Sequence, residues 1–145
     1  EEENLHVRFI NMNNIYCCFL LLGSRDDIRR ATEVMEGLLF NYQQVAFHRI
    51  YDQIFGTLIM GYFMLEDYVK VQECYKRYEK LTANSSKFPE NDITIKGFYY
   101  VSQWIVSGRK QYQEKLNSLL TKTEGVRNLD STKEMLLDLK EYYNC

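Results

Sequence analysis

Residues that interrupt helices are scarce in this sequence. Its 145 residues include one proline, Pro89, and seven glycines. Such a composition favours long helices over many short strands, which need frequent turns. Hydrophobic residues make up 46% of the chain, a fraction too high for a disordered segment. The length suits one domain, whose core needs neither a metal nor a disulfide. We therefore expect a single all-α domain over residues 1–145.

Excess positive charge is also absent. The chain has 18 Lys and Arg against 20 Asp and Glu, a formal net charge of -2. Binding to nucleic acid needs a concentrated basic surface, because it depends on neutralising phosphates. The densest basic cluster, at residues 25–30, is interleaved with acidic residues and is typical of a solvated helix face. We expect no direct contact with nucleic acid.

Long hydrophobic runs are missing too. The longest fully apolar run, Ile15 to Leu22, is far shorter than the roughly 20 residues that a membrane-spanning helix needs. No charged segment followed by an apolar one opens the chain as a secretory signal would. We expect no membrane association and a cytoplasmic location. The chain begins with Glu1 rather than Met, and we expect it to be a segment of a longer protein.

Motifs for catalysis or metal binding are absent. The four cysteines form no CxxC pair and have no Cys/His ligand spacing, and no acidic partner at helical spacing singles out either of the two histidines. No glycine-rich phosphate loop or nucleophile elbow occurs. Gly56 and Gly61 lie inside a predicted helix, where we expect them to permit close helix packing. We therefore expect no cofactor, no metal and no enzymatic activity.

Apolar residues recur at helical spacing through almost the whole chain. Gly23 and Gly108 end two of the predicted helices, and Ser24 with Asp27 resembles a capping box that opens the second. Asn84, Ser85, Ser86 and Pro89 predict a loop between about residues 83 and 90. The predicted helices cover about residues 5–22, 24–41, 44–65, 68–82, 91–107, 110–122 and 130–143.

The turns between paired helices repeat at a nearly constant interval. They fall at Gly23, Glu66 and Gly108, which predicts a helical hairpin repeated about every 42 residues. A large aromatic residue stands four residues before each turn: Phe19, Tyr62 and Trp104. A single hairpin leaves an apolar face uncovered, and stacking one hairpin on the next covers it.

The middle hairpin carries a more specific pattern. Its ordered positions are Phe55, Leu58, Tyr62, the turn Glu66-Asp67-Tyr68, Val71 and Tyr75. This pattern resembles a tetratricopeptide repeat, and the resemblance covers about residues 5–123. The chain departs from that family at Ile59 and Tyr78, where small residues are usual, and at Glu66, where glycine is usual. The closing proline is missing, and the units are longer than the family's usual 34 residues or so.

The resemblance implies a right-handed α-α superhelix of three antiparallel helix pairs plus a C-terminal capping helix. The pairs would span about residues 5–41, 44–82 and 91–123, and the cap 130–143. In such a fold the first helix of each pair lines a concave groove. The implied groove residues are Asn13, Cys17, Gly56, Met60, Phe63, Phe98, Ser102 and Ile105.

This groove predicts a non-catalytic scaffold that binds a protein or peptide, which belongs either to another protein or to another domain of the same protein. Its lining is mainly apolar, and Met60 could adapt to varied shapes. A stripe of methionine and aromatic residues at helical spacing is also typical of a core that the chain fills itself. The alternative function is a ligand-sensing regulatory domain of a larger transcriptional or signalling protein, an analogy at the level of fold.

Overall fold

The chain is helical over every residue range that the computed structural model describes, namely 2–41, 48–84 and 87–145. Within these ranges it has seven α-helices, one short 3-10 helix and no strand. The helices are α1 (Glu2–Leu22), α2 (Arg25–Asn41), α3 (His48–Met64), α4 (Tyr68–Thr82), α5 (Pro89–Ser107), α6 (Lys110–Thr123) and α7 (Asp130–Tyr143), with η1 (Arg127–Leu129) before the last. The prediction of an all-α fold is confirmed.

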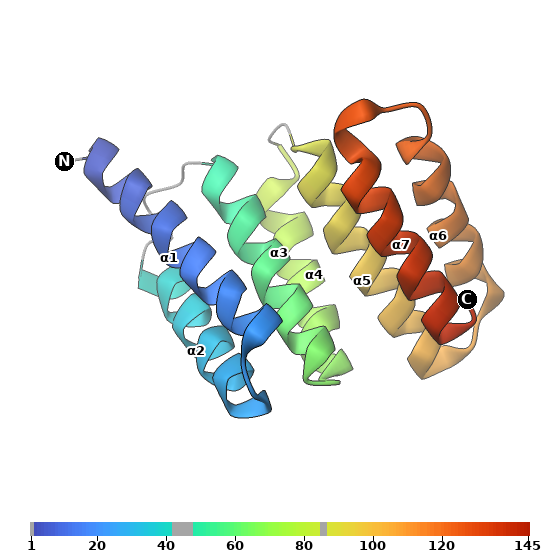
Figure 1. The fold of residues 1–145 in the computed structure, drawn as a ribbon, viewed down its shortest axis with the longest axis horizontal. Coiled ribbons are helices and arrows are strands. Elements are labelled where there is room, and N and C mark those ends of the chain that lie inside the picture. Colours follow the sequence, from blue (N-terminus) through green and yellow to red (C-terminus); the bar gives the residue numbers. More distant parts are fainter. Residues whose placement is uncertain (1, 42–47, 85–86) are drawn as a thin grey trace.

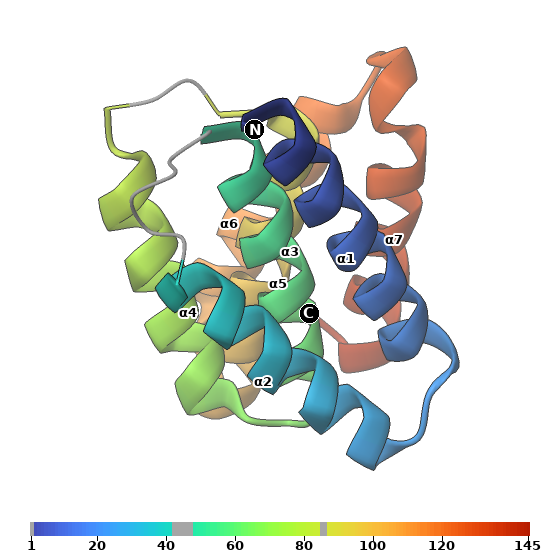
Figure 2. The same cartoon turned by 90° about the vertical axis from the view of Figure 1, so that its left-hand side faces the viewer.

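The helices lie side by side along the long axis of the molecule in nearly the order of the sequence (Figure 1). The odd-numbered helices run in one direction and the even-numbered helices return in the other. Each odd-numbered helix after the first contacts both helices before it: α3 contacts α1 and α2, α5 contacts α3 and α4, and α7 contacts α5 and α6. Viewed from its N-terminal end, the stack has α1 and α2 nearest the viewer (Figure 2).

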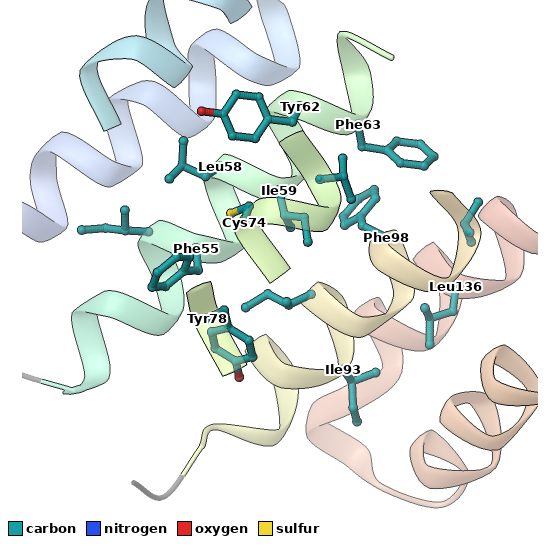
Figure 3. Packing of buried hydrophobic residues seen from close by; sticks show 14 of the residues in the cluster. Phe55, Leu58, Ile59, Tyr62, Phe63, Cys74, Tyr78, Ile93, Phe98 and Leu136 are labelled. Atoms are coloured by element: carbon teal, nitrogen blue, oxygen red, sulfur yellow. The ribbon is translucent and has the colours of Figure 1, made fainter. Parts of the chain in front are cut away.

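The main core lies around α3 and α5. Phe55, Leu58 and Ile59 on α3 are fully buried, and the Phe55 ring meets the Tyr78 ring edge-on at 5.7 Å. Figure 3 shows these side chains of α3 and α4 together with Ile93 and Phe98 of α5. Burial of such side chains contributes about 1.5–3 kcal/mol each, so α3 and α5 supply much of the stability. A smaller cluster of Leu20, Ile28 and Ala31 joins α1 to α2.

Helix α2 begins at Arg25, directly after Ser24, the first residue of the predicted capping box. The backbone N–H of Ser24 donates to Asp27 Oδ2 at 2.8 Å, and the N–H of Asp27 donates to Ser24 Oγ at 3.3 Å. These bonds satisfy donors that the first turn of a helix cannot pair internally. The capping-box prediction is confirmed.

The turns after α3 and α5 each contain a residue in the left-handed backbone conformation, as does the end of α7 at Asn144. Gly108 has φ 63°, and its N–H donates to the Trp104 carbonyl at 2.8 Å. Glu66, the corresponding residue of the preceding hairpin, has φ 58°, and its N–H donates to the Phe63 carbonyl at 3.0 Å. The conformation costs glycine little but costs a residue with a Cβ about 1–2 kcal/mol. Glu66 therefore stands where glycine would fit better.

The structure differs from the prediction at the start of the fifth helix, and it does not describe the predicted start of the third. The fifth helix begins at Pro89 rather than at about residue 91, with Phe88 as the N-cap. Proline breaks a helix from inside but suits its first position, where the missing N–H has no partner anyway. The predicted start of the third helix, about residue 44, lies outside the described residues, as do residues 85 and 86 of the predicted loop.

Close helix packing occurs at one of the two predicted glycines. A Cβ on Gly61 would lie 2.5 Å from Thr32 Cγ2 and 3.2 Å from a methyl of Leu20, so α3 approaches α1 and α2 closely there. A Cβ on Gly56 would meet nothing nearer than Ile95 at 4.0 Å. The packing prediction is therefore confirmed for Gly61 and wrong for Gly56.

The three aromatics that precede the turns have different surroundings. Tyr62 is buried between α2 and α4, and its hydroxyl donates to Glu36 at 2.6 Å. Trp104 is half-buried and donates through Nε1 to the Tyr143 carbonyl at 3.2 Å. Phe19 is largely exposed and has the Tyr16 ring 5.9 Å away. Their spacing predicts the turns but not a shared environment.

Candidate functional site

Four of the eight predicted groove residues are covered by the chain itself. Asn13, Phe63 and Phe98 expose between 5% and 7% of their surface, and Ser102 exposes none. They cannot offer surface to a partner in this conformation, so their prediction as open groove lining is wrong. The other four, Cys17, Gly56, Met60 and Ile105, are half-buried.

Asn13 and Cys17 form the contact between α1 and α3. Thr57 Oγ1 on α3 donates to Asn13 Oδ1 at 2.7 Å, a buried bond between residues 44 positions apart. The Cys17 thiol also hydrogen-bonds to Thr57, and burial raises its pKa. A thiol with a raised pKa is a weaker nucleophile at neutral pH. The two residues therefore join helices.

Phe63 and Phe98 form the contact that joins α3, α5 and α7. The Phe63 ring lies 5.1 Å from the Phe98 ring and 5.5 Å from the Tyr143 ring, which it meets edge-on. Figure 3 shows Phe63, at the end of α3, beside Phe98, in the middle of α5. Such aromatic pairs add about 0.5–1.5 kcal/mol each beyond the area they bury.

The remaining candidates also face neighbouring helices. Met60 packs against both the main core and the Leu20 cluster, Ile105 packs against the main core, and Ser102 donates to the Tyr99 carbonyl of its own helix at 2.7 Å. The errors at the four buried candidates have one physical reason in common, while Cys17, Gly56, Met60 and Ile105 stay a prediction. The face that the resemblance assigns to a groove is the face through which the odd-numbered helices contact one another.

An open hollow of about 780 Å³ lies on α7. Among the described residues, it is lined by Ser131, Glu134, Met135, Asp138, Leu139, Glu141, Tyr142 and Tyr143. Met135 and Leu139 are half-buried, whereas Tyr142 is 79% exposed and its ring lies 4.8 Å from that of Tyr143. The hollow therefore has an apolar floor with one aromatic side chain standing free in solvent.

The floor of the hollow is held by the core. Tyr143 packs against Phe63, and its carbonyl accepts the hydrogen bond from Trp104 Nε1. Burial raises the pKa of the Tyr143 hydroxyl, with Tyr68 contributing in the same direction, so the ring stays neutral at physiological pH. A surface fixed in this way loses little conformational entropy when a partner binds.

The rim of the hollow is acidic. Glu134, Asp138 and Glu141 line it, and no lysine or arginine does so among the described residues. Lys140, on the same helix, instead donates to Asn117 Oδ1 on α6 at 2.6 Å. The acidic residues and this lysine therefore lie on different sides of α7, and the charged side chains on the described rim are all acidic.

Sequence reasoning did not single out this surface. The sequence predicts the last helix only as a C-terminal cap. The available signal was the series Met135, Leu139 and Tyr142 at steps of four and three, with acidic residues beside it. The pattern alone could not show that the neighbouring helices leave this side of α7 uncovered.

A second hollow, of about 810 Å³, lies between α2 and the turn from α3 to α4. At its side, Glu36 on α2 accepts a hydrogen bond from Tyr62 and another from Arg77 Nη1 at 2.9 Å. Burial and then the Glu36 carboxylate raise the pKa of Tyr62, which keeps its proton on the hydroxyl. The lining mixes both signs of charge, including Arg25, Arg29, Glu33 and Glu66, and selects no single class of ligand.

Metal-ligand clusters and membrane spans are not found in the part of the chain that is described. No group of three or more His, Cys, Asp or Glu side chains is placed to hold a metal ion there. None of the described helices combines the length and the apolar character needed to cross a bilayer. Comparison with protein-family models, curated proteins and solved structures finds no match to this chain.

Proposed function

We propose that this chain is a non-catalytic protein-interaction module that binds a basic, partly apolar peptide segment in the α7 hollow. The observation that carries the proposal is the exposed ring of Tyr142 above an apolar floor with an acidic rim. The peptide could belong to another protein or to another domain of the same protein. The free cysteines, of which Cys74 and Cys145 are buried, suit a reducing compartment such as the cytosol.

The proposed architecture is a right-handed α-α superhelix of three antiparallel pairs, which α7 extends. Its support is the recurring contact of each odd-numbered helix with both helices of the pair before it. In this arrangement α7 takes the place of the first helix of a fourth pair. Such helices line the concave side in the repeat family that the sequence resembles, so the hollow is the part of that side still open.

The chemistry of the hollow defines its partner. An arginine or lysine of the peptide pairs with Glu134 or Asp138, and an arginine can also stack on the exposed Tyr142 ring. An apolar side chain one helical turn away packs on Leu139 and Met135. Of these two, Met135 adapts its shape more readily. An amphipathic helix with basic and apolar residues at spacings of three and four provides both groups.

The test uses two labelled helical peptides with the same leucines, one with arginines and one with glutamates on the polar face. Fluorescence anisotropy should show saturable binding of the arginine peptide and none of the glutamate peptide. Asp138→Lys should weaken binding at least tenfold, while the matched control Glu114→Lys, on exposed α6, should bind as the unmodified chain does. Equal binding of both peptides, or equal affinity of both variants, would contradict the proposal.

A ligand-sensing regulatory role is the second candidate, and it is supported by the second hollow. This hollow draws its lining from α2, α3 and α4, so a small molecule bound there would change how two hairpins stack. A screen of charged metabolite-sized compounds by thermal shift tests this role. A stabilising compound should lose its effect in Arg29→Ala and keep it in Asp138→Lys. If no compound gives a shift that depends on Arg29, this second candidate fails.

A further inference from the structure

The exposed face of α1 lacks the charges that a solvated helix face normally has. Asn13 and Leu20 bury one side of α1 against its neighbours, and the opposite side is exposed. From Phe9 to Leu22 the sequence contains no Asp, Glu, Lys or Arg. The large apolar side chains exposed on α1 are Val7 (52%), Ile15 (53%), Phe19 (44%), Leu21 (69%) and Leu22 (87%).

These five side chains form a patch at the upper end of the size range found on monomers. Their exposed fractions correspond to roughly 500 Å² of apolar area, near the upper limit for the largest patch of a typical monomer. Asn11, Asn14 and Cys18 lie on the same face and are also exposed. Together these residues supply most of the about 800 Å² that each partner contributes to a standard interface.

We propose that this face binds the same face of a second copy of the chain, with the two α1 helices antiparallel across a two-fold axis. An isologous contact requires that each residue meet a partner that meets it in return. A two-fold axis passing between Asn14 and Ile15 meets that requirement. It places Val7 opposite Leu22 of the other copy, and Asn11 opposite Cys18.

The polar residues of the face also favour a second copy over a lipid surface. Asn14 lies beside the axis, where its amide can donate to and accept from the Asn14 amide of the other copy, and the Asn11 amide faces the Cys18 thiol, a weak donor and acceptor. Hydrocarbon would leave these amides without partners, at a cost of several kcal/mol each. Helices that lie in a membrane interface usually carry a lysine- or arginine-rich polar face, and the middle of α1 has no basic residue.

The position of α1 leaves space for this contact. With α2 it forms the end of the helix stack that faces the viewer in Figure 2, so no later helix of the same chain covers it there. The peptide proposal concerns α7 and uses none of these residues. Failure of one proposal therefore leaves the other standing.

The first experiment measures mass in solution. Sedimentation velocity at tens of micromolar should give a dimer for the unmodified chain and a monomer for Ile15→Asp and for Phe19→Asp. Leu81→Asp is the matched control, because Leu81 is an equally exposed apolar residue on α4 (56%) and the change adds the same charge. The control should remain a dimer, and circular dichroism should show unchanged helicity in all three variants.

The second experiment locates the axis. Asn14→Cys in a Cys18→Ser background should join two copies rapidly with a short bis-maleimide, and Leu81→Cys in the same background should not. A monomeric unmodified chain, a dimer that survives Ile15→Asp, or cross-linking that is no faster at residue 14 than at residue 81 overturns the proposal. So does binding of the monomer to neutral lipid vesicles that Ile15→Asp abolishes.

Discussion

The ring of Phe63 at the end of α3 meets the ring of Tyr143 at the end of α7 edge-on, 5.5 Å away. The two residues are far apart in the sequence, and Phe98 on α5 completes the contact from a third helix. One buried aromatic therefore connects the centre of the stack to its last helix and to the floor of the α7 hollow.

Truncating Phe63 should destabilise the whole domain. We expect Phe63→Ala to lower the free energy of unfolding by about 3–5 kcal/mol, because it leaves a cavity among three helices. Phe63→Leu keeps most of the apolar volume and should cost much less. Urea denaturation followed by circular dichroism gives both values. A cost below about 1 kcal/mol for Phe63→Ala would contradict the packing described.

Replacing Glu66 by glycine should stabilise the fold. The left-handed φ of 58° strains any residue with a Cβ, so Glu66→Gly should raise the free energy of unfolding by about 0.5–1 kcal/mol. Gly108→Ala, at φ 63°, should lower it by about 1 kcal/mol. Thermal unfolding of the two variants beside the unmodified chain should show melting temperatures that move in opposite directions. Movement in the same direction would refute this account of the turns.

Replacement by alanine should have opposite effects on stability at the two glycines of α3. Gly61→Ala forces a Cβ against Thr32 and Leu20 and should cost about 1–3 kcal/mol. Gly56→Ala has room and should gain about 0.5–1 kcal/mol, since alanine loses less backbone entropy in a helix. Chemical denaturation can measure both variants. Equal effects would show that α3 is no closer to its neighbours at Gly61 than at Gly56.

Alkaline pH should destabilise the fold through Cys74. Burial raises the pKa of this thiol to about 12, against 9.0 for an unperturbed cysteine. Between these values the unfolded chain releases a proton that the folded chain retains, so stability falls as pH rises. From pH 8 to pH 10 the unmodified chain should lose about 1 kcal/mol more than Cys74→Ala does. Urea midpoints at the two pH values test this, and identical losses would contradict it.

The sequence predicted the helices better than it predicted the surface. Helix ends depend on local chemistry, so the Ser24 capping box and Gly108 were informative by themselves. The bounds of the last helix, residues 130–143, agree with the prediction. Pro89 was wrongly predicted to lie in the loop, because a proline can end a helix or occupy the first position of the next one.

The site was harder to predict because it depends on contacts between distant residues. Asn13 lies on the side of α1 opposite its exposed face, yet only its bond to Thr57 shows that another helix covers it. The α7 surface had the opposite problem, since its polar residues looked like those of any solvated helix. Periodicity distinguishes one side of a helix from another, but it does not say which sides meet other helices and which remain free.

Trp104 is the single tryptophan of the chain, and its indole is hydrogen-bonded to the carbonyl of a residue that lines the hollow. Any ligand that shifts the end of α7 will change the polarity around that indole. The intrinsic emission spectrum of the unlabelled chain is thus a built-in optical sensor of occupancy at that end, readable in a cuvette without dye or tag.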